Sequence, residues 1–170
     1  THIFKAHNNI YIEQPEENYR TREIRTEMVF PDCVNENTGM LVLIPGYGGN
    51  IDSHVFRKMR EVFAEQYNLI TVQCDYFGNK FMDVKQPEEM KLIATMENIV
   101  NAEIYYKVED FETVEEFNDM GIMQAIDIVS STICAIYEII RKGYVFNTNK
   151  IILFGTSHGA YLAHLANIIC

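Results

Sequence analysis

The sequence predicts an α/β fold, in which a mostly parallel sheet is flanked by helices, and three observations carry this prediction. Residues 40–44 form a continuous apolar run bounded by turn residues, a pattern typical of a strand buried on both faces, and residues 69–74 and 151–154 are interpreted as two further buried strands. Segments with helical spacing of apolar residues separate these runs. A glycine-containing turn follows the first and the last run. This alternation indicates parallel strands joined by right-handed crossovers.

The first 38 residues favour β-structure at the edge of this sheet. Residues 9–13 and 22–30 are the two β-leaning segments. In the second segment, charged residues alternate with Ile24, Thr26, Met28 and Phe30. We therefore expect antiparallel edge strands within residues 1–38, followed by a turn-rich link.

Residues 40–74 are interpreted as one βαβ unit. After the strand at 40–44, a helix is predicted at 53–67, with Ser53 available as its N-cap and Asn68 at its end. The apolar positions that recur at helical spacing in this segment are Val55, Met59, Val62 and Phe63. The strand at 69–74 completes the unit.

The rest of the chain combines an insertion with a helix, a strand and a last helix. Residues 75–119 exceed the length that a crossover needs, and we expect a helix at 87–103 and an acidic loop at 108–119. Residues 120–170 predict a long buried helix at 121–141, a strand at 150–154 and a helix at 160–169. Gly143 lies at the end of the long helix, whose predicted buried stripe is Ile122, Ile126, Val129, Ile133, Ile136 and Ile140.

The composition limits the classes of partner that we expect this chain to bind. The formal net charge is -10 and 48% of the residues are hydrophobic, as in soluble acidic globular proteins. Nucleic acid is not an expected partner, because its phosphates require clustered Lys and Arg. Asp127 and Glu138 interrupt the most apolar stretch, so no membrane span is predicted. Residues 1–11 lack the pattern of a secretory signal, and we expect a cytoplasmic location.

The cysteines give no indication of a cofactor. Cys33, Cys74, Cys134 and Cys170 are widely spaced without a C-x-x-C pair, which favours reduced structural thiols over a disulfide framework or a zinc site. The turn at residues 46–50 lacks the G-x-G-x-x-G pattern, so a dinucleotide-binding fold is a weaker alternative. We predict no metal and no cofactor.

Residues 155–159 read GTSHG, the G-x-S-x-G pattern, between a predicted strand and a predicted helix. This context predicts a nucleophile elbow that presents Ser157. Larger side chains two residues to either side would collide as the strand turns into the helix, so Gly155 and Gly159 fit the spacing. The alternative is that Ser157 is an ordinary N-cap of the helix.

A second glycine-containing turn follows the strand at 40–44. Two backbone N–H groups aimed at a developing oxyanion lower the barrier to acyl transfer, and we assign them to Tyr47 and His158. Gly46, Gly48 and Gly49 would let this backbone approach the reacting carbon closely. A flexible turn without such a role is the alternative.

The order of elements, the PGYGG turn and the GTSHG turn together resemble the α/β-hydrolase superfamily. Residues 117–123 (FNDMGIM) and 155–163 (GTSHGAYLA) are similar to an uncharacterised bacterial branch carried as a domain of unknown function. The resemblance covers the chain from about Arg22 onward. It implies a serine hydrolase with Ser157 as the nucleophile, the Tyr47 and His158 N–H groups as the oxyanion hole, and a small acyl or ester substrate.

The sequence departs from the superfamily after Ser157, where an acid and then a histidine should follow. His158 is expected to point away from Ser157 Oγ, His164 lies about two helical turns on, and we expect His2, His7 and His54 on the surface. Residues 1–170 therefore predict an incomplete hydrolase domain, and the alternative function is a noncatalytic binding or accessory module. As an isolated chain it should lack esterase activity. It should also self-associate through the strand at 151–154, or bind a complementing C-terminal half.

Overall fold

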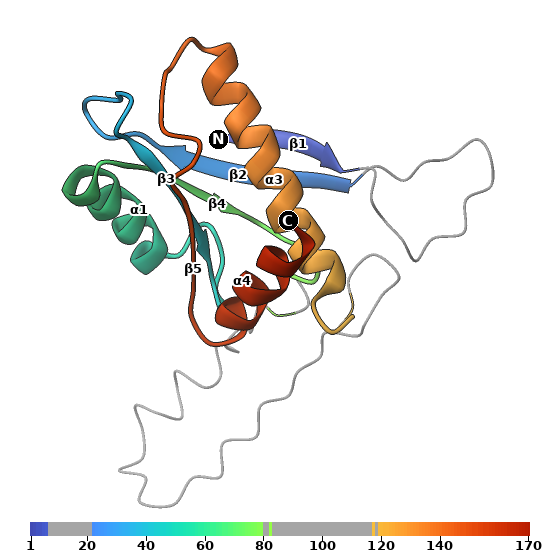
Figure 1. Cartoon of the computed structure of the whole chain (residues 1–170). Coiled ribbons are helices and arrows are strands. Elements are labelled where there is room, and N and C mark those ends of the chain that lie inside the picture. The colour runs from blue at the N-terminus through green and yellow to red at the C-terminus, as the bar shows by residue number, and fades with distance from the viewer. Residues whose placement is uncertain (7–21, 80–81, 83–116, 118) are drawn as a thin grey trace, which may run out of the picture.

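The computed structural model describes residues 1–6, 22–79, 82, 117 and 119–170 (Figure 1). Within these residues the sheet order is β1-β2-β4-β3-β5. β3 pairs in parallel with β4 and β5, whereas β2 pairs antiparallel with β1 and β4. The strands are β1 (His2–Ala6), β2 (Arg22–Val29), β3 (Gly39–Ile44), β4 (Leu69–Cys74) and β5 (Ile151–Gly155). The three predicted parallel strands and their adjacency are confirmed. The predicted burial of the last strand on both faces is wrong, because β5 pairs on one side only among the described residues and most of its residues are exposed.

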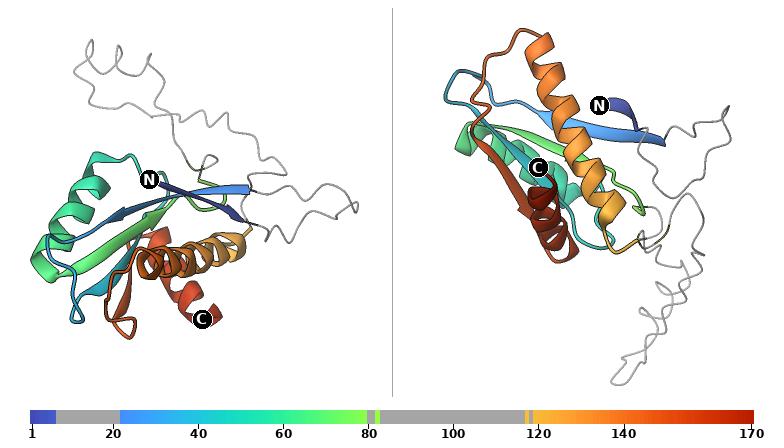
Figure 2. Two further views of the ribbon diagram at one scale, coloured as in Figure 1. Left: turned by 90° about the horizontal axis from the view of Figure 1, so that it is seen from above. Right: turned by 45° about the vertical axis from the view of Figure 1, so that its right-hand side comes forward.

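Helices cover both faces of the sheet (Figure 2). α1 (His54–Tyr67) lies on one face, and α3 (Ile122–Arg141) and α4 (His158–Ile169) lie on the other. Successive strand residues point to opposite faces, so β3 contributes to two cores. Leu41 and Leu43 pack toward α1, whereas Met40, Val42 and Ile44 join the larger core beneath α3 and α4. A mixed sheet flanked in this way is the α/β-hydrolase-like arrangement that the sequence predicts.

The first edge strand of the sheet lies at other residues than the sequence predicts. β1 spans His2–Ala6, a strand that the sequence did not single out, and it pairs antiparallel with β2 as an edge strand. The strand expected at residues 9–13, the helix expected at 87–103 and most of the 75–119 insertion lie outside the described residues. The predicted helix at 53–67 is confirmed as α1, and Asn68 ends it in a left-handed conformation with φ 50°.

The predicted end of the long helix is confirmed in detail. Gly143 has φ +82°, a conformation that favours glycine. Its N–H donates to the Ile140 carbonyl at 2.9 Å, and the N–H of Tyr144 donates to the Ile139 carbonyl at 3.2 Å. This is a Schellman ending, which satisfies carbonyls that the last turn would leave without partners.

The predicted buried stripe of α3 is wrong for three of its six residues, whereas Val129 and Ile136 pack partly buried against the core. Ile122, Ile133 and Ile140 are 43%, 60% and 55% exposed. The opposite side packs on the sheet because its small side chains allow close approach, and its polar members find partners there. The buried residues of α3 are Met123, Gln124, Ala125, Asp127, Ile128, Ser131, Ala135 and Ile139.

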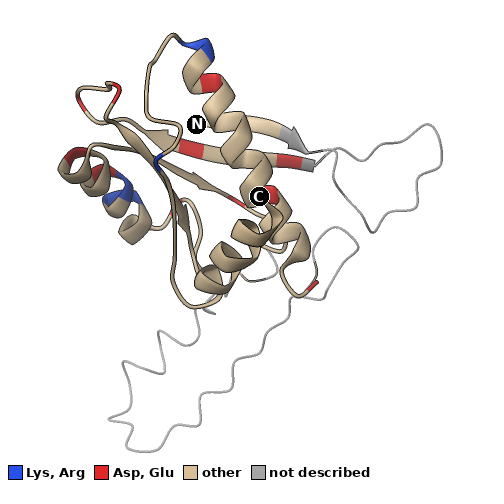
Figure 3. Cartoon of the chain, viewed as in Figure 1, with Lys and Arg blue, Asp and Glu red and all other residues tan. Residues whose placement is uncertain are grey.

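Length and composition alone would allow α3 to cross a bilayer, contrary to our expectation from Asp127 and Glu138. The core helix of a soluble protein passes the same test. In the described part of the chain, the charged residues are spread along strands and helices, and Lys and Arg lie in separate elements in Figure 3.

Asp127 ties α3 to the end of β4. Its carboxylate is fully buried and accepts a hydrogen bond from the Phe77 N–H at 2.8 Å. Replacing Asp127 by alanine removes this acceptor and leaves a buried N–H group, which costs about 1–3 kcal/mol. We expect the melting temperature to fall by about 2–4 °C per kcal/mol lost. Asp127→Asn keeps an acceptor oxygen and should lose less stability, and equal losses in the two variants would contradict this role.

Candidate active site

Ser157 lies at the sharp turn between β5 and α4. Its backbone has φ 54° and ψ -125°, a combination that side-chain-bearing residues rarely adopt and that clusters at functional sites. The residue is exposed, and although it occupies the N-cap position of α4, its side chain makes no capping hydrogen bond. The ordinary N-cap interpretation therefore lacks the contact on which it depends.

Glycines on both sides of Ser157 make this turn possible. A Cβ on Gly155 would come within 2.0 Å of the Gly159 carbonyl oxygen. A Cβ on Gly159 would come within 2.1 Å of the Ile44 carbonyl oxygen, at the end of the neighbouring strand β3. Real Cβ atoms do not approach backbone this closely, so the predicted steric reason for the glycine spacing agrees with the structure.

The turn after β3 touches the turn that carries Ser157. A Cβ on Gly46 would lie 2.8 Å from the Thr156 carbonyl oxygen and 3.1 Å from Ser157 Cβ. Both turns follow the carboxyl ends of adjacent parallel strands, because β3 pairs with β5 from Met40 to Ile44. Tyr47 and Ser157 therefore lie at the same end of the sheet, as predicted.

The 46–49 turn has a defined backbone. The Gly49 N–H donates to the Gly46 carbonyl at 2.9 Å, and Gly48 has φ +75°, as the third position of a type II turn requires. In a trans peptide the C=O and the N–H point in opposite directions. The bond from Gly49 therefore turns the Tyr47 N–H away from the interior of the turn.

The side chain of His158 is held by α3. One ring nitrogen, Nε2, lies 2.7 Å from Gln124 Oε1, and the ring packs beside Tyr161 with centroids 5.9 Å apart. Burial lowers the pKa of His158, although the Asp119 carboxylate acts in the opposite direction. His158 can contribute its backbone N–H at the start of α4 while its imidazole is engaged elsewhere.

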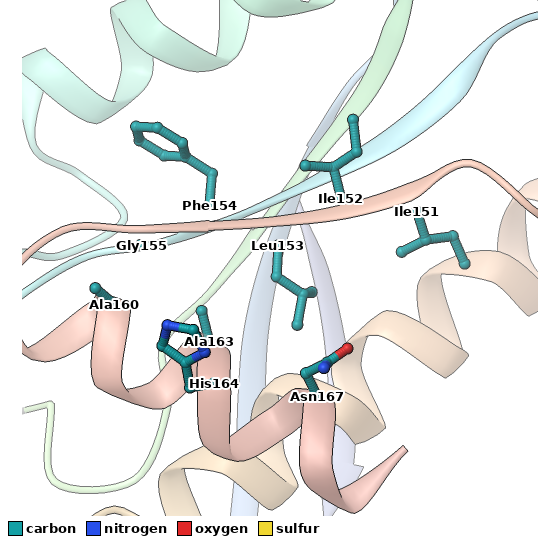
Figure 4. A pocket seen from close by; sticks show the side chains of 9 residues that line it. All are labelled: Ile151, Ile152, Leu153, Phe154, Gly155, Ala160, Ala163, His164 and Asn167. Atoms are coloured by element: carbon teal, nitrogen blue, oxygen red, sulfur yellow. The ribbon is translucent and has the colours of Figure 1, made fainter.

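No hydrogen bond joins the Ser157 hydroxyl to a histidine or a carboxylate among the residues that the structure describes. His164 lines a hollow of about 510 Å³ between β5 and α4, beside Leu153, Gly155 and Asn167, and Ser157 is not part of its lining (Figure 4). Among the described residues no group of three His, Cys, Asp or Glu side chains could hold a metal ion.

Two polar residues at this end of the fold were missed by sequence reasoning. Gln124 is buried on α3 and contacts His158, and Tyr76 is buried just after β4, with its hydroxyl 2.7 Å from the Pro45 carbonyl. The sequence signals that could have found them were a polar residue on an otherwise apolar helix and an aromatic residue directly after a strand of the parallel sheet.

Residues 79–170, just over half of the chain, match the family described as a protein of unknown function, DUF2920. The chain belongs to this family. Both segments that carried the narrower resemblance, residues 117–123 and 155–163, lie inside the DUF2920 match. No curated protein matches the chain.

One solved structure similar to this member of DUF2920 is Est1E from Butyrivibrio proteoclasticus with ferulic acid bound, at 15% identity and a TM-score of 0.45. The match covers 86% of this chain and 44% of that structure. This chain therefore spans less than half the length of the protein that it matches.

Proposed function

We propose that this chain carries the nucleophile and the oxyanion hole of a serine hydrolase that acts on small acyl or ester substrates. The observation that carries the proposal is the strained backbone of Ser157, with φ 54° and ψ -125°, at a glycine-flanked turn against the loop after β3. This strained backbone supports the proposal of a nucleophile elbow, a turn in which the serine hydroxyl stands exposed above the sheet.

The backbone N–H groups of Tyr47 and His158 are the proposed oxyanion hole. The first lies in the loop after β3 and the second directly follows Ser157, the two places from which α/β-hydrolases supply these donors. One such donor lowers the barrier by about 3 kcal/mol. Gly46 allows the loop after β3 to lie against the Ser157 turn, and Gly155 and Gly159 allow the close approach within that turn and to the end of β3. Gly48 and Gly49 complete the proposed supporting turn.

Attack by Ser157 on an acyl carbon requires a general base, because an unactivated serine is a weak nucleophile. The resemblance orders the triad as serine, acid and histidine, and we place the last two in polypeptide that follows Ser157 in the gene product. The serine proton would pass to this histidine as the bond to the acyl carbon forms. The histidine would give this proton to the alcohol that leaves as the ester C–O bond breaks. Water, deprotonated by the same histidine, would then attack the acyl-serine, which releases the carboxylic acid and returns the proton to the Ser157 hydroxyl.

The absence of a hydrogen-bonded base beside Ser157 among the described residues favours a second candidate, a noncatalytic binding or accessory module. A fluorophosphonate probe applied to the full-length gene product separates the two. We expect rapid labelling that Ser157→Ala abolishes. Ser53→Ala is the matched control, because Ser53 also occupies a helix N-cap position without a capping hydrogen bond. A folded wild-type protein that the probe does not label would support the binding module.

Self-association is a further prediction for residues 1–170 expressed alone. In the described part of the chain β5 pairs only with β3, and Ile152 and Phe154 are 42% and 38% exposed. Apolar strand edges recruit other strands, whereas a lysine on the edge discourages pairing. We expect Ile152→Lys to lower the sedimentation coefficient at micromolar concentration. Identical monomers in both samples would show that this edge is covered.

A further inference from the structure

We propose that Tyr76 is a positioning residue for the oxyanion loop, holding the peptide that precedes Gly46 through its hydroxyl. The inference rests on the proposed function for its kinetic consequence. Its structural content is independent of any activity, because it concerns one hydrogen bond between the end of β4 and the end of β3.

The position of Tyr76 is fixed by burial. Its side chain is 2% exposed, joins the larger core, and follows β4 by two residues. A buried hydroxyl needs a partner, and the hydroxyl of Tyr76 donates to the Pro45 carbonyl at 2.7 Å. Burial holds the pKa of Tyr76 above its ordinary value, so the hydroxyl keeps its proton and remains a donor at any working pH.

The Pro45 carbonyl lies between Tyr76 and the turn that carries Ser157. The same oxygen would be 2.7 Å from a Cβ on Gly159, so it lies close against the start of α4. Pinning this carbonyl fixes the orientation of the Pro45–Gly46 peptide, since the peptide unit is planar. The next peptide is held by the bond from the Gly49 N–H to the Gly46 carbonyl.

Two consecutive peptide units, Pro45–Gly46 and Gly46–Tyr47, are thus each held by a hydrogen bond to the carbonyl oxygen. The second unit carries the Tyr47 N–H. Losing the Gly49 bond would require a change in the turn itself. Losing the Tyr76 bond requires only the removal of one oxygen atom. Tyr76→Phe keeps the ring in the core, removes the donor and leaves the loop entry free to rotate, so it isolates the positioning role.

The expected kinetic effect is a fall in kcat of about tenfold with little change in KM. This is smaller than the roughly 10²–10³-fold loss on removing an oxyanion donor, because the Tyr47 N–H remains present but less well aimed. If a variant that only weakens the fold lost as much kcat, the loss in Tyr76→Phe would not indicate a positioning role. The experiment therefore needs a control variant that removes a similar buried hydrogen bond away from the loop.

Thr26→Val is that control. The Thr26 and Ser131 hydroxyls, both buried, lie 2.8 Å apart and join β2 to α3. The substitution removes one buried neutral hydrogen bond from the same sheet, as Tyr76→Phe does, without touching the loop. We expect similar losses of melting temperature in the two variants and a loss of kcat only in Tyr76→Phe.

Hydrogen exchange gives a readout that does not depend on catalysis. In the full-length protein carrying Ser157→Ala, Tyr76→Phe should speed amide exchange in residues 46–49, and Thr26→Val should not. If the wild-type protein hydrolyses no ester but exchange in this loop still responds to Tyr76→Phe, the positioning role stands and the proposed function fails. If exchange is unchanged and kcat falls no more than in Thr26→Val, the positioning role is overturned.

Discussion

Replacing Ser157 by alanine is expected to remove ester hydrolysis by the full-length gene product, with kcat/KM falling by about 10³-fold or more. The loss is large because the hydroxyl forms the covalent bond, and neither the oxyanion hole nor substrate binding can replace it. Initial rates on short p-nitrophenyl esters measure the effect. A Ser157→Ala protein that retains a tenth of the wild-type rate would assign the reaction to another residue.

The fold should survive this substitution, which makes the kinetic result interpretable. Serine and alanine carry the same Cβ, so the strain at φ 54° is unchanged. Ser157→Gly should instead raise the melting temperature, because glycine adopts positive φ without steric cost. A thermal midpoint that rises in Ser157→Gly and stays constant in Ser157→Ala would show that the strained turn exists in solution.

Gly159→Ala is expected to lower the free energy of unfolding more than alanine at any other described glycine except Gly155. The new Cβ would meet the Ile44 carbonyl oxygen at 2.1 Å, and this backbone atom cannot swing aside. Overpacking of this kind costs about 1–3 kcal/mol and more where backbone must move. Urea denaturation of the variant should show a loss at or above the upper end of that range, or no folded protein.

Gly143→Ala is the control for Gly159→Ala. Gly143 has φ +82°, and an added methyl carbon there would have no atom within 4 Å, so alanine meets backbone strain but no collision. We expect a loss of about 1 kcal/mol. Equal losses of unfolding free energy in Gly159→Ala and Gly143→Ala would mean that the start of α4 lies farther from the Ile44 carbonyl than the structure places it.

β3 and β4 could be predicted because both are buried along their whole length and are rich in apolar residues. β5 could be predicted from its apolar run alone, because most of its residues are exposed. The orientation of α3 could not, because both sides of this helix carry apolar residues. Ile133 and Ile140 are larger than Ala125 and Ala135, yet the alanines face the sheet, since close approach of the helix favours small side chains. β1 was missed because His2–Ala6 mixes polar and apolar residues, whereas the equally short β5 begins with four consecutive apolar residues.

The residues of the candidate site also divide into those that the sequence could predict and those that it could not. Ser157 and its flanking glycines could be found from sequence because the constraint is local, acting between a strand end and the first turn of the next helix. Tyr76 and Gln124 could not, because their partners Pro45 and His158 are 31 and 34 residues away in the chain. Only the folded sheet brings these pairs together.

Trapping the acyl-enzyme is the most direct test of whether Ser157 is the nucleophile. The full-length protein is mixed with a short p-nitrophenyl ester, quenched in acid during the first turnover, digested and analysed by mass spectrometry. We expect one added acyl group on the peptide that contains Ser157, and none in Ser157→Ala. An acyl group on another residue, or p-nitrophenol release with Ser157 never acylated, would contradict this expectation.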